Sequence, residues 1–214
     1  MSYFVTGASG FIGRHLLQNL LDNRKGKIYV LTRSQSKKRL QEMLKSMPGS
    51  ERVVPVTGDL TRKNLGVSKK YREELAGKIR HFFHLAAVYD LGASAEAQIP
   101  AALSLAEVLK SGCFHHVSSI AAAGLYAGVF REDMLDEAEN LDHPYFRTKH
   151  DSEKLVRDQA GVKYRIYRPA IVIGHSKTGE MDKIDGPYYF FKLIQKMRSV
   201  LPSWVPAIGI EGGR

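Results

Sequence analysis

Three glycines near the start of the chain constrain its fold more than any other feature. A short apolar run at residues 3–5 precedes Gly7, Gly10 and Gly13, and an amphipathic segment that begins at Phe11 includes the last of them. A strand, a glycine turn and a helix in this order are the context of a dinucleotide-binding turn, although a glycine triplet also occurs in ordinary turns. Glycines let the backbone approach a pyrophosphate, whose charge then meets free N–H groups at the helix N-terminus. The expected cofactor contacts here are Gly7, Ser9, Gly10, Phe11, Ile12 and Gly13.

Strand and helix patterns alternate along the chain up to about residue 174. Short strands rich in Val, Ile and Phe are predicted at residues 3–5, 27–31, 52–56, 79–85, 113–118 and 164–167. Helices are predicted after the glycine turn and at residues 35–47, 100–110 and 145–159. This alternation predicts an α/β fold of Rossmann type, a doubly wound parallel sheet with helices on both faces.

The pattern changes after Gly174. A loop rich in glycine and charge follows, and then an aromatic helix is predicted at residues 188–200. We therefore divide the chain into an NAD(P)-binding domain at residues 1–174 and the start of a smaller substrate-binding region at residues 175–214. The aromatic helix is expected either to line a pocket or simply to contribute to a core.

Composition narrows the classes of function. The 214 residues are 43% hydrophobic and 25% charged, which are globular values. A single cysteine, Cys113, is typical of a reducing cytoplasm, and the first strand starts too early to leave room for a signal peptide. No apolar stretch reaches the roughly 18 residues of a membrane span. The net charge of +10 fits a solvated surface or an anionic small molecule, and we expect no nucleic-acid partner because no such motif is present.

The end of the second predicted strand favours NADP(H) over NAD(H). Residues 30–34 contain no Asp or Glu where an NAD enzyme would bind the ribose 2′-hydroxyl. Arg33 instead supplies a planar cation that suits a 2′-phosphate. Lys37, Lys38 and Arg39 follow closely, but most of these charges are also what a solvent-facing helix carries.

The candidate catalytic side chains are a serine pair and a tyrosine with a lysine four residues later. Tyr145 and Lys149 share one face of a predicted helix, so the lysine charge would lower the phenol pKa from its usual value of about 10. Pro144 fits the first helical position, which places Tyr145 in the first turn. Such a pair is common by itself. Ser118 and Ser119, at the carboxyl end of the fifth strand, give it weight, because Ser119 can bond a carbonyl oxygen that Tyr145 protonates.

In their order and spacing these motifs resemble the extended branch of the short-chain dehydrogenase/reductases. The matching segments are residues 6–13, 58–60, 84–87, 118–119, 145 with 149, and 168–170. The resemblance implies that Ser119 is the catalytic serine, that Tyr145 is the proton donor and that Lys149 binds the nicotinamide ribose. It also implies cofactor contacts near the adenine, beneath the cofactor and at the nicotinamide from Asp59, Leu60, Ala86, Ala87, Pro169, Ala170 and Ile171. Two of these have an ordinary alternative, since Asp59 could cap a loop and Pro169 could end a strand.

Within that branch, residues 82–89, 117–121 and 186–194 look most similar to the fatty acyl-CoA and thioester reductases. This similarity implies an NADPH-dependent reduction of an acyl thioester or of the derived aldehyde. A sugar-nucleotide epimerase or dehydratase of the same branch is one alternative, and an NADP-binding sensor or scaffold without turnover is another. No metal is expected, because His115, His116 and His143 lack the spacing of a ligand set.

The chain departs from the family pattern in two places. Family members usually carry an Asn-x-x-Gly-Thr segment before the fifth strand, whereas no Asn lies between Asp90 and Ser118 here. Extended members also usually continue further to complete a substrate-binding domain, so residues 175–214 are expected to be only part of one. Relatives often form homodimers through a four-helix bundle, to which the helix at 145–159 would contribute.

Overall fold

The computed structural model describes residues 1–86, 95–159, 161–181 and 188–200. The chain divides into two compact units, Met1–Tyr126 with Phe130–Pro169, and Ala127–Val129 with Ala170–Arg214. Ala87 and part of the similar segment at 82–89 lie outside the described residues.

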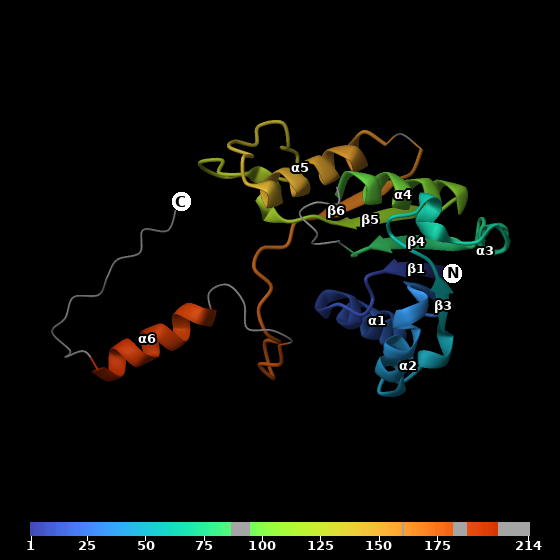
Figure 1. The fold of residues 1–214 in the computed structure, drawn as a ribbon, viewed down its shortest axis with the longest axis horizontal. Coiled ribbons are helices and arrows are strands. Elements are labelled where there is room, and N and C mark those ends of the chain that lie inside the picture. The colour runs from blue at the N-terminus through green and yellow to red at the C-terminus, as the bar shows by residue number, and fades with distance from the viewer. Residues whose placement is uncertain (87–94, 160, 182–187, 201–214) are drawn as a thin grey trace. The chain divides into compact units, whose positions relative to one another are not determined.

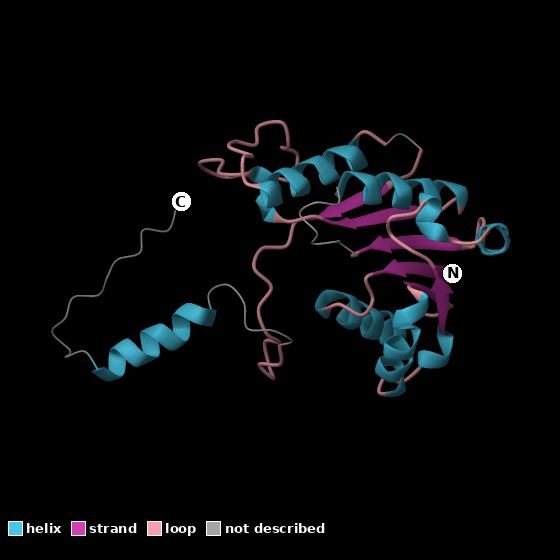
Figure 2. Ribbon diagram, viewed as in Figure 1, coloured by secondary structure: helices cyan, strands magenta, loops and turns pink. Residues whose placement is uncertain are grey.

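The first unit is built on a six-stranded parallel sheet with the order β3-β2-β1-β4-β5-β6 (Figures 1 and 2). The strands are β1 Ser2–Thr6, β2 Ile28–Thr32, β3 Val53–Thr57, β4 Ile79–His84, β5 Cys113–Val117 and β6 Tyr164–Tyr167. The chain winds outward from β1 on one side and resumes at β4 on the other, which is the doubly wound topology. The predicted fold class is confirmed, and each predicted strand end lies within one residue of the observed one.

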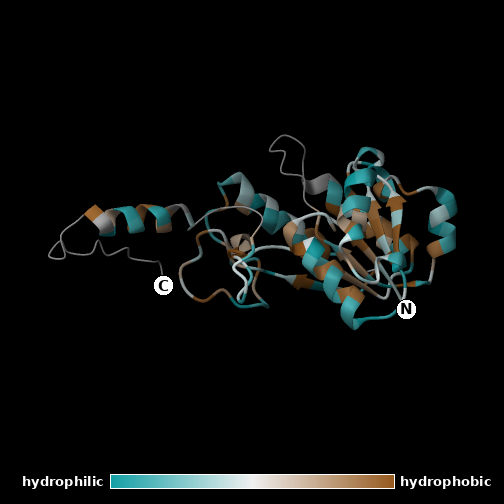
Figure 3. Cartoon of the chain, turned by 90° about the horizontal axis from the view of Figure 1, so that it is seen from below, coloured by the Kyte–Doolittle hydropathy of each residue, from teal (hydrophilic) through white to brown (hydrophobic). Residues whose placement is uncertain are grey.

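Helices cover both faces of this sheet. Helices α1 Phe11–Asn23 and α2 Lys37–Lys45 lie on one face, and α4 Ala95–Val108 and α5 Pro144–Arg157 lie on the other (Figure 1). The first pair covers a core that contains Val5 and Leu17. The second pair covers a core built around Phe4, Phe82 and Phe114. Figure 3 shows the consequence, hydrophobic strands enclosed by helices with hydrophilic outer surfaces.

Helix boundaries differ from the prediction more than strand boundaries do. The predicted helix at 35–47 is a 3₁₀ turn, Ser34–Ser36, followed by α2. Helix α4 begins at Ala95 rather than at Pro100, so that this proline lies inside the helix instead of at its usual place in the first turn. It ends before Lys110, which takes a positive φ of 49° and donates from its N–H to the Glu107 carbonyl.

The sequence pattern contained no sign of α3 Lys69–Leu75. This helix has seven residues, and only Leu75 among them is buried, so no apolar period marks it. Its start is capped by Ser68, whose hydroxyl accepts from the Tyr71 N–H at 3.4 Å.

The sheet brings the predicted site residues to one edge. In a parallel sheet all strands end at the same edge, where ligands of such folds bind. Gly7 follows β1, Arg33 follows β2 and Asp59 lies two residues after β3. Ala86 lies two residues after β4, and the remaining residues that follow strand ends at this edge are Ser118, Ser119, Arg168 and Pro169.

The second unit contains α6 Tyr188–Val200, at the predicted position. The Tyr188 hydroxyl accepts from the Gly174 N–H at 3.0 Å. A cavity of about 380 Å³ is lined by Met181, Tyr188, Phe191, Lys192, Ile194 and Gln195. Other apolar side chains of α6 are exposed, for example Phe190 at 58%. Within the described part of the chain, no helix has the length and apolar character needed to cross a membrane.

Candidate functional site

The turn between β1 and α1 has no room for side chains at two of its glycines. Gly7 has a φ of +74°, and a Cβ there would lie 2.6 Å from the Ala86 backbone nitrogen. A Cβ on Gly13 would lie 2.1 Å from the Gly7 carbonyl oxygen. Gly10 begins α1 without a side-chain cap, and α1 has no acidic residue in its first turn. These features fit the pyrophosphate of a dinucleotide, which needs close backbone approach and free N–H groups.

The other predicted residues of this turn differ in how far they are exposed to solvent. Ser9, Gly10 and Ile12 are exposed, and the Phe11 ring is half-buried against His15 with ring centroids 4.9 Å apart. The side chain of Thr6, which the sequence analysis did not single out, ties the turn to β4. Its Oγ1 accepts from the Ala86 N–H at 3.3 Å and bonds His84 Nδ1 at 3.0 Å. The ends of β1 and β4 are therefore joined directly beneath the glycine turn.

Arg33 and Asp59 come together at the ends of β2 and β3. The Asp59 carboxylate accepts from the backbone N–H and the hydroxyl of Thr61, at 2.9 and 2.8 Å. These bonds, with smaller contributions from the charges of Arg62 and Arg33, hold the Asp59 pKa below its usual range. Asp59 thus caps its own turn, as the ordinary alternative expected. Leu60 packs against the core, and Arg33 is exposed.

The catalytic candidates are positioned by the start of α5 and by the turn after β5. Ser119 begins the 3₁₀ turn Ile120–Ala123, and its Oγ accepts from the Ala121 N–H at 3.2 Å. Helix α5 is fastened to this turn by the buried His150, whose Nδ1 lies 3.2 Å from the Ala122 carbonyl oxygen. The Ile120 N–H also donates to the Pro169 carbonyl at 3.2 Å, which joins the end of β6 to the same turn.

Tyr145 and Lys149 are adjacent on α5, as their spacing predicts. The Lys149 Nζ lies 5.8 Å from the centroid of the Tyr145 ring. Tyr145 is 36% exposed, whereas Lys149 is partly buried, and burial lowers the Lys149 pKa. The first turn is held by Pro144 at its start and by His143, whose Nδ1 accepts from the Tyr145 N–H at 3.2 Å. An accessible phenol therefore lies next to a shielded cation.

Two buried histidines lie close enough to Lys149 for its charge to affect them. The sequence analysis assigned them no role. His84 and His116 stack with ring centroids 6.2 Å apart. Burial lowers both pKa values to about 3, with smaller contributions from the charge of Lys149 on both rings and of His116 on His84. Both rings are therefore neutral at pH 7. In the described residues, His84 Nε2 and both His116 ring nitrogens have no hydrogen-bond partner.

The remaining candidates are Ala170, Ile171 and His115. Ala170 and Ile171 belong to the second unit, where Ile171 is 64% exposed. His115 bonds His81 and Tyr167 at 2.9 Å each, so its two ring nitrogens are occupied. Among the residues that the structure describes, no group of three or more His, Cys, Asp or Glu could hold a metal.

Comparison with known proteins gives one family and several relatives. A family model described as male sterility protein matches residues 5–209. The chain is 30% identical over 204 residues to a linear gramicidin synthase component of Brevibacillus parabrevis, in a match that covers 85% of this chain and 4% of that protein. It is 28% identical over 221 residues to a putative fatty acyl-CoA reductase of Drosophila melanogaster, in a match that covers 80% of this chain and 41% of that protein.

Solved structures show the same fold. The terminal R domain of the myxalamid PKS-NRPS biosynthetic pathway has a TM-score of 0.71 at 27% identity, over 92% of this chain and 55% of that one. A dTDP-glucose 4,6-dehydratase of Streptomyces venezuelae, at 22% identity and a TM-score of 0.63, shares the fold alone. The chain thus spans less than half of both curated relatives described above and 55% of the solved R domain. With a family model that matches residues 5–209, the chain belongs to the male sterility protein family of the extended short-chain dehydrogenase/reductases.

Proposed function

We propose that this chain is the NADPH-binding part of a reductase that acts on an acyl thioester or on the derived aldehyde. The observation that carries the proposal is the pairing of Tyr145 with Lys149 on a helix that is fastened to the Ser119 turn. The Ser119 turn follows β5 at the sheet edge where the glycine turn follows β1. The relatives named as a putative fatty acyl-CoA reductase and, at 30% identity, as an aldehyde reductase of Aspergillus flavus support the substrate class.

Each catalytic candidate has a distinct task in this reaction. Ser119 Oγ already accepts from the Ala121 N–H, so its hydrogen is free to donate to a substrate carbonyl oxygen. Tyr145 gives its phenolic proton to the same oxygen as negative charge develops there, and Lys149 stabilises the tyrosinate that remains. When bound, NADPH supplies the hydride that the carbonyl carbon takes up.

The second unit supports an apolar substrate. The cavity beside α6 has a volume of about 380 Å³ and is lined by aromatic and aliphatic side chains such as Tyr188, Phe191 and Ile194. That volume falls within the range of about 300–1,000 Å³ that is usual for small-molecule sites. A lining of this kind suits an acyl chain. A cytoplasmic location and a homodimer stay predictions.

The catalytic test uses Tyr145→Phe. We expect kcat for a long-chain acyl-CoA or its aldehyde to fall by roughly 10²- to 10⁴-fold, because a positioned acid contributes about that much. The affinity for NADPH, measured by calorimetry, stays unchanged. Tyr164→Phe is the matched control, because Tyr164 is also exposed but lies at the start of β6. Full activity in Tyr145→Phe would contradict the assigned proton donor.

The cofactor test uses Arg33→Ala. Loss of a guanidinium–phosphate contact is expected to weaken NADPH binding by roughly 10- to 100-fold, since hydrogen bonds to charged groups contribute about 1.5–3 kcal/mol. NADH binding is unchanged, because NADH has no 2′-phosphate. Arg39→Ala, on the exposed side of α2, is the control and keeps its preference for NADPH. Equal binding of both cofactors by the unaltered chain would overturn the assignment of Arg33.

A further inference from the structure

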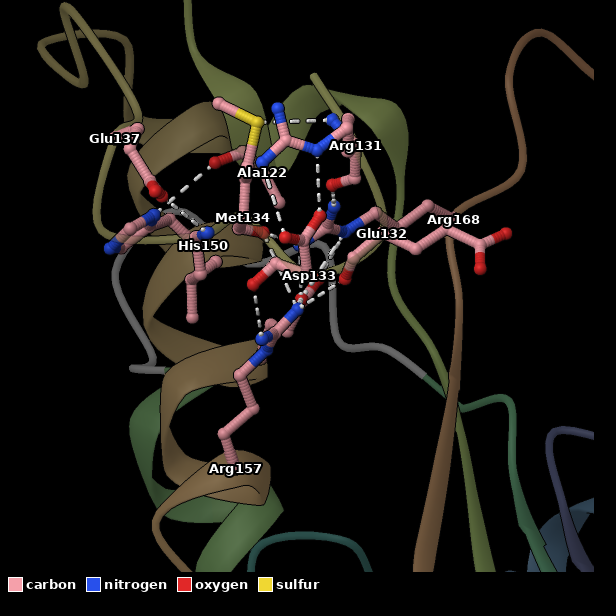
Figure 4. Close-up of polar contacts among 11 residues, drawn as sticks. Ala122, Arg131, Glu132, Asp133, Met134, Glu137, His150, Arg157 and Arg168 are labelled. Carbon is pink, nitrogen blue, oxygen red and sulfur yellow. Dashed lines mark hydrogen bonds and ion pairs between the residues drawn. The ribbon is translucent and has the colours of Figure 1, made fainter.

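Glu153 is a completely buried carboxylate in α5, and two arginines hold it, Arg157 and Arg168, which are labelled in Figure 4. Arg168 approaches it with two nitrogens, Nη2 to Oε1 at 2.6 Å and Nε to Oε2 at 3.0 Å. Arg157, one turn further along α5, donates to Oε1 from Nε at 3.0 Å and from Nη2 at 2.9 Å. Burial alone would raise the Glu153 pKa, but these hydrogen bonds and charges outweigh it and the pKa is lowered.

The same two arginines also hold the loop that follows Phe130. Arg168 donates to the backbone carbonyls of Arg131 and Met134, and its guanidinium lies 4.9 Å from the centroid of the Phe130 ring. Arg157 donates to three carbonyls of the same loop, at distances of 3.0–3.4 Å, those of Glu132, Asp133 and Met134. One carboxylate therefore joins three segments: helix α5, the end of β6 and the loop at 130–134.

Two of these segments carry residues of the proposed site. Tyr145, Lys149 and Glu153 follow each other at intervals of four, so they lie along one flank of α5. Directly after β6, Arg168 precedes Pro169, whose carbonyl accepts from the Ile120 N–H beside Ser119. A rotation of α5 would therefore move Tyr145 and Lys149 relative to Ser119, and it would break the bonds between Glu153 and Arg168.

We propose that Glu153, gripped by Arg168 and Arg157, is a positioning residue that sets the rotation of α5 and so aligns Tyr145 and Lys149 with Ser119. This inference rests on the proposed reductase function. A buried ion pair adds little net stability compared with apolar packing, but it has narrow geometric requirements, since each partner left alone would be an unpaired buried charge. Because Arg168 lies outside α5 and holds Glu153 with two nitrogens, this ion pair can keep the helix from rotating.

The test compares Glu153→Gln with the unaltered chain in kcat, KM, NADPH affinity and thermal stability. We expect kcat to fall at least tenfold while NADPH affinity and the KM for the acyl substrate stay within about twofold, because the change misaligns groups that act in the transition state. Leu75→Ala in α3 is the control for lost stability, because Leu75 is buried in the same core but away from α5. It is expected to lower the melting temperature and leave kcat unchanged below it.

A second pair of variants keeps the inference testable if Glu153→Gln does not fold. Arg157→Lys retains the charge and loses the forked contacts, and Arg157 is partly exposed, at 25% of its side chain. It is expected to lower kcat several-fold. Arg131→Ala serves as its control, because the Arg131 side chain is 64% exposed and pairs with Asp133, while the backbone carbonyl that accepts from Arg168 is kept. It is expected to leave kcat unchanged.

A readout without turnover separates this inference from the proposed function. The nuclear Overhauser contact between the His150 ring of α5 and Ala122 of the Ser119 turn is expected to weaken in Glu153→Gln and to persist in Leu75→Ala. If the unaltered chain reduces neither acyl-CoA nor aldehyde, the proposed function is wrong. If it does, and Glu153→Gln keeps both its kcat and this contact, Glu153 is not a positioning residue.

Discussion

Gly7 and Gly77 share a backbone φ of +74° but differ in their surroundings. A Cβ on Gly7 would lie 2.6 Å from the Ala86 backbone nitrogen, whereas a Cβ on Gly77 would have nothing within 4 Å. The two positions therefore separate the cost of a left-handed backbone from the cost of a blocked approach.

We expect Gly77→Ala to lower the free energy of unfolding by about 1 kcal/mol, the conformational cost alone. Gly7→Ala should cost several times as much, because the backbone at Ala86 must shift, and it should abolish NADPH binding. Urea unfolding and calorimetric titration with NADPH measure the two effects. Equal losses of stability in both variants would show that contact with Ala86 does not constrain the turn.

Among single residues, the local geometry was predictable where it depends on near neighbours. The glycine turn and the Tyr145–Lys149 pair depend on spacings of a few residues, and the structure shows the expected close packing and adjacency. Glu153 was not predictable. A glutamate followed four residues later by an arginine is typical of an exposed helix face. The tertiary structure instead buries this glutamate completely and brings Arg168, which follows β6, to it.

At the scale of elements, the first turn of α5 depends on its cap. Pro144 occupies the start of the helix, and the ring of His143 accepts from the Tyr145 N–H at 3.2 Å. This bond orders the turn that carries the proposed proton donor. The cap therefore connects local helix stability to the position of Tyr145.

His143→Ala is expected to lower stability by about 0.5–2 kcal/mol, as other lost caps do, and to lower kcat because the first turn frays. His143→Asn should restore most of both, because its side-chain oxygen can accept the same bond. Chemical denaturation and steady-state kinetics check the two effects. If Ala and Asn at this position behave alike, the cap does not order the turn.

Strands were more predictable than helices. Each strand is a short apolar run with clear ends, whereas α3 lacks an apolar period and α4 continues through Pro100. The end of α4 also depends on Lys110, a residue that rarely takes a positive φ. The carbonyls of Ala106 and Glu107 accept from Ser111 and Lys110 there, and these bonds offset the backbone cost.

At the scale of the whole molecule, the neutral histidines behind the site predict how stability depends on pH. The pKa values of His84 and His116 fall from 6.5 in their ordinary state to about 3 in the folded chain. Between those values the unfolded chain binds protons that the folded chain does not. Stability is therefore complete above about pH 6.5 and decreases as the pH falls towards 3.

His84 and His116 together contribute a slope of as much as about 2.7 kcal/mol per pH unit, since one proton corresponds to about 1.4, and His115, whose pKa burial lowers to about 4, adds to it. His116→Leu should reduce the slope by as much as about 1.4 kcal/mol per pH unit and cost little at pH 7, because neither His116 ring nitrogen has a partner in the described residues. Urea unfolding from pH 7 to pH 4 measures this, with the exposed His15→Leu as control. An unchanged slope in His116→Leu would contradict the neutral buried state.

The sequence by itself determined the α/β class, the strands, the glycine turn and the family, because these depend on patterns of neighbouring residues and on their order. Only the tertiary structure decided which distant side chains meet. Thr6 with His84, His84 with His116, and Glu153 with Arg168 are each brought together by strand pairing or helix packing over long stretches of chain. Burial then changes what these groups do, because a charge or ring removed from water takes its properties from its new neighbours.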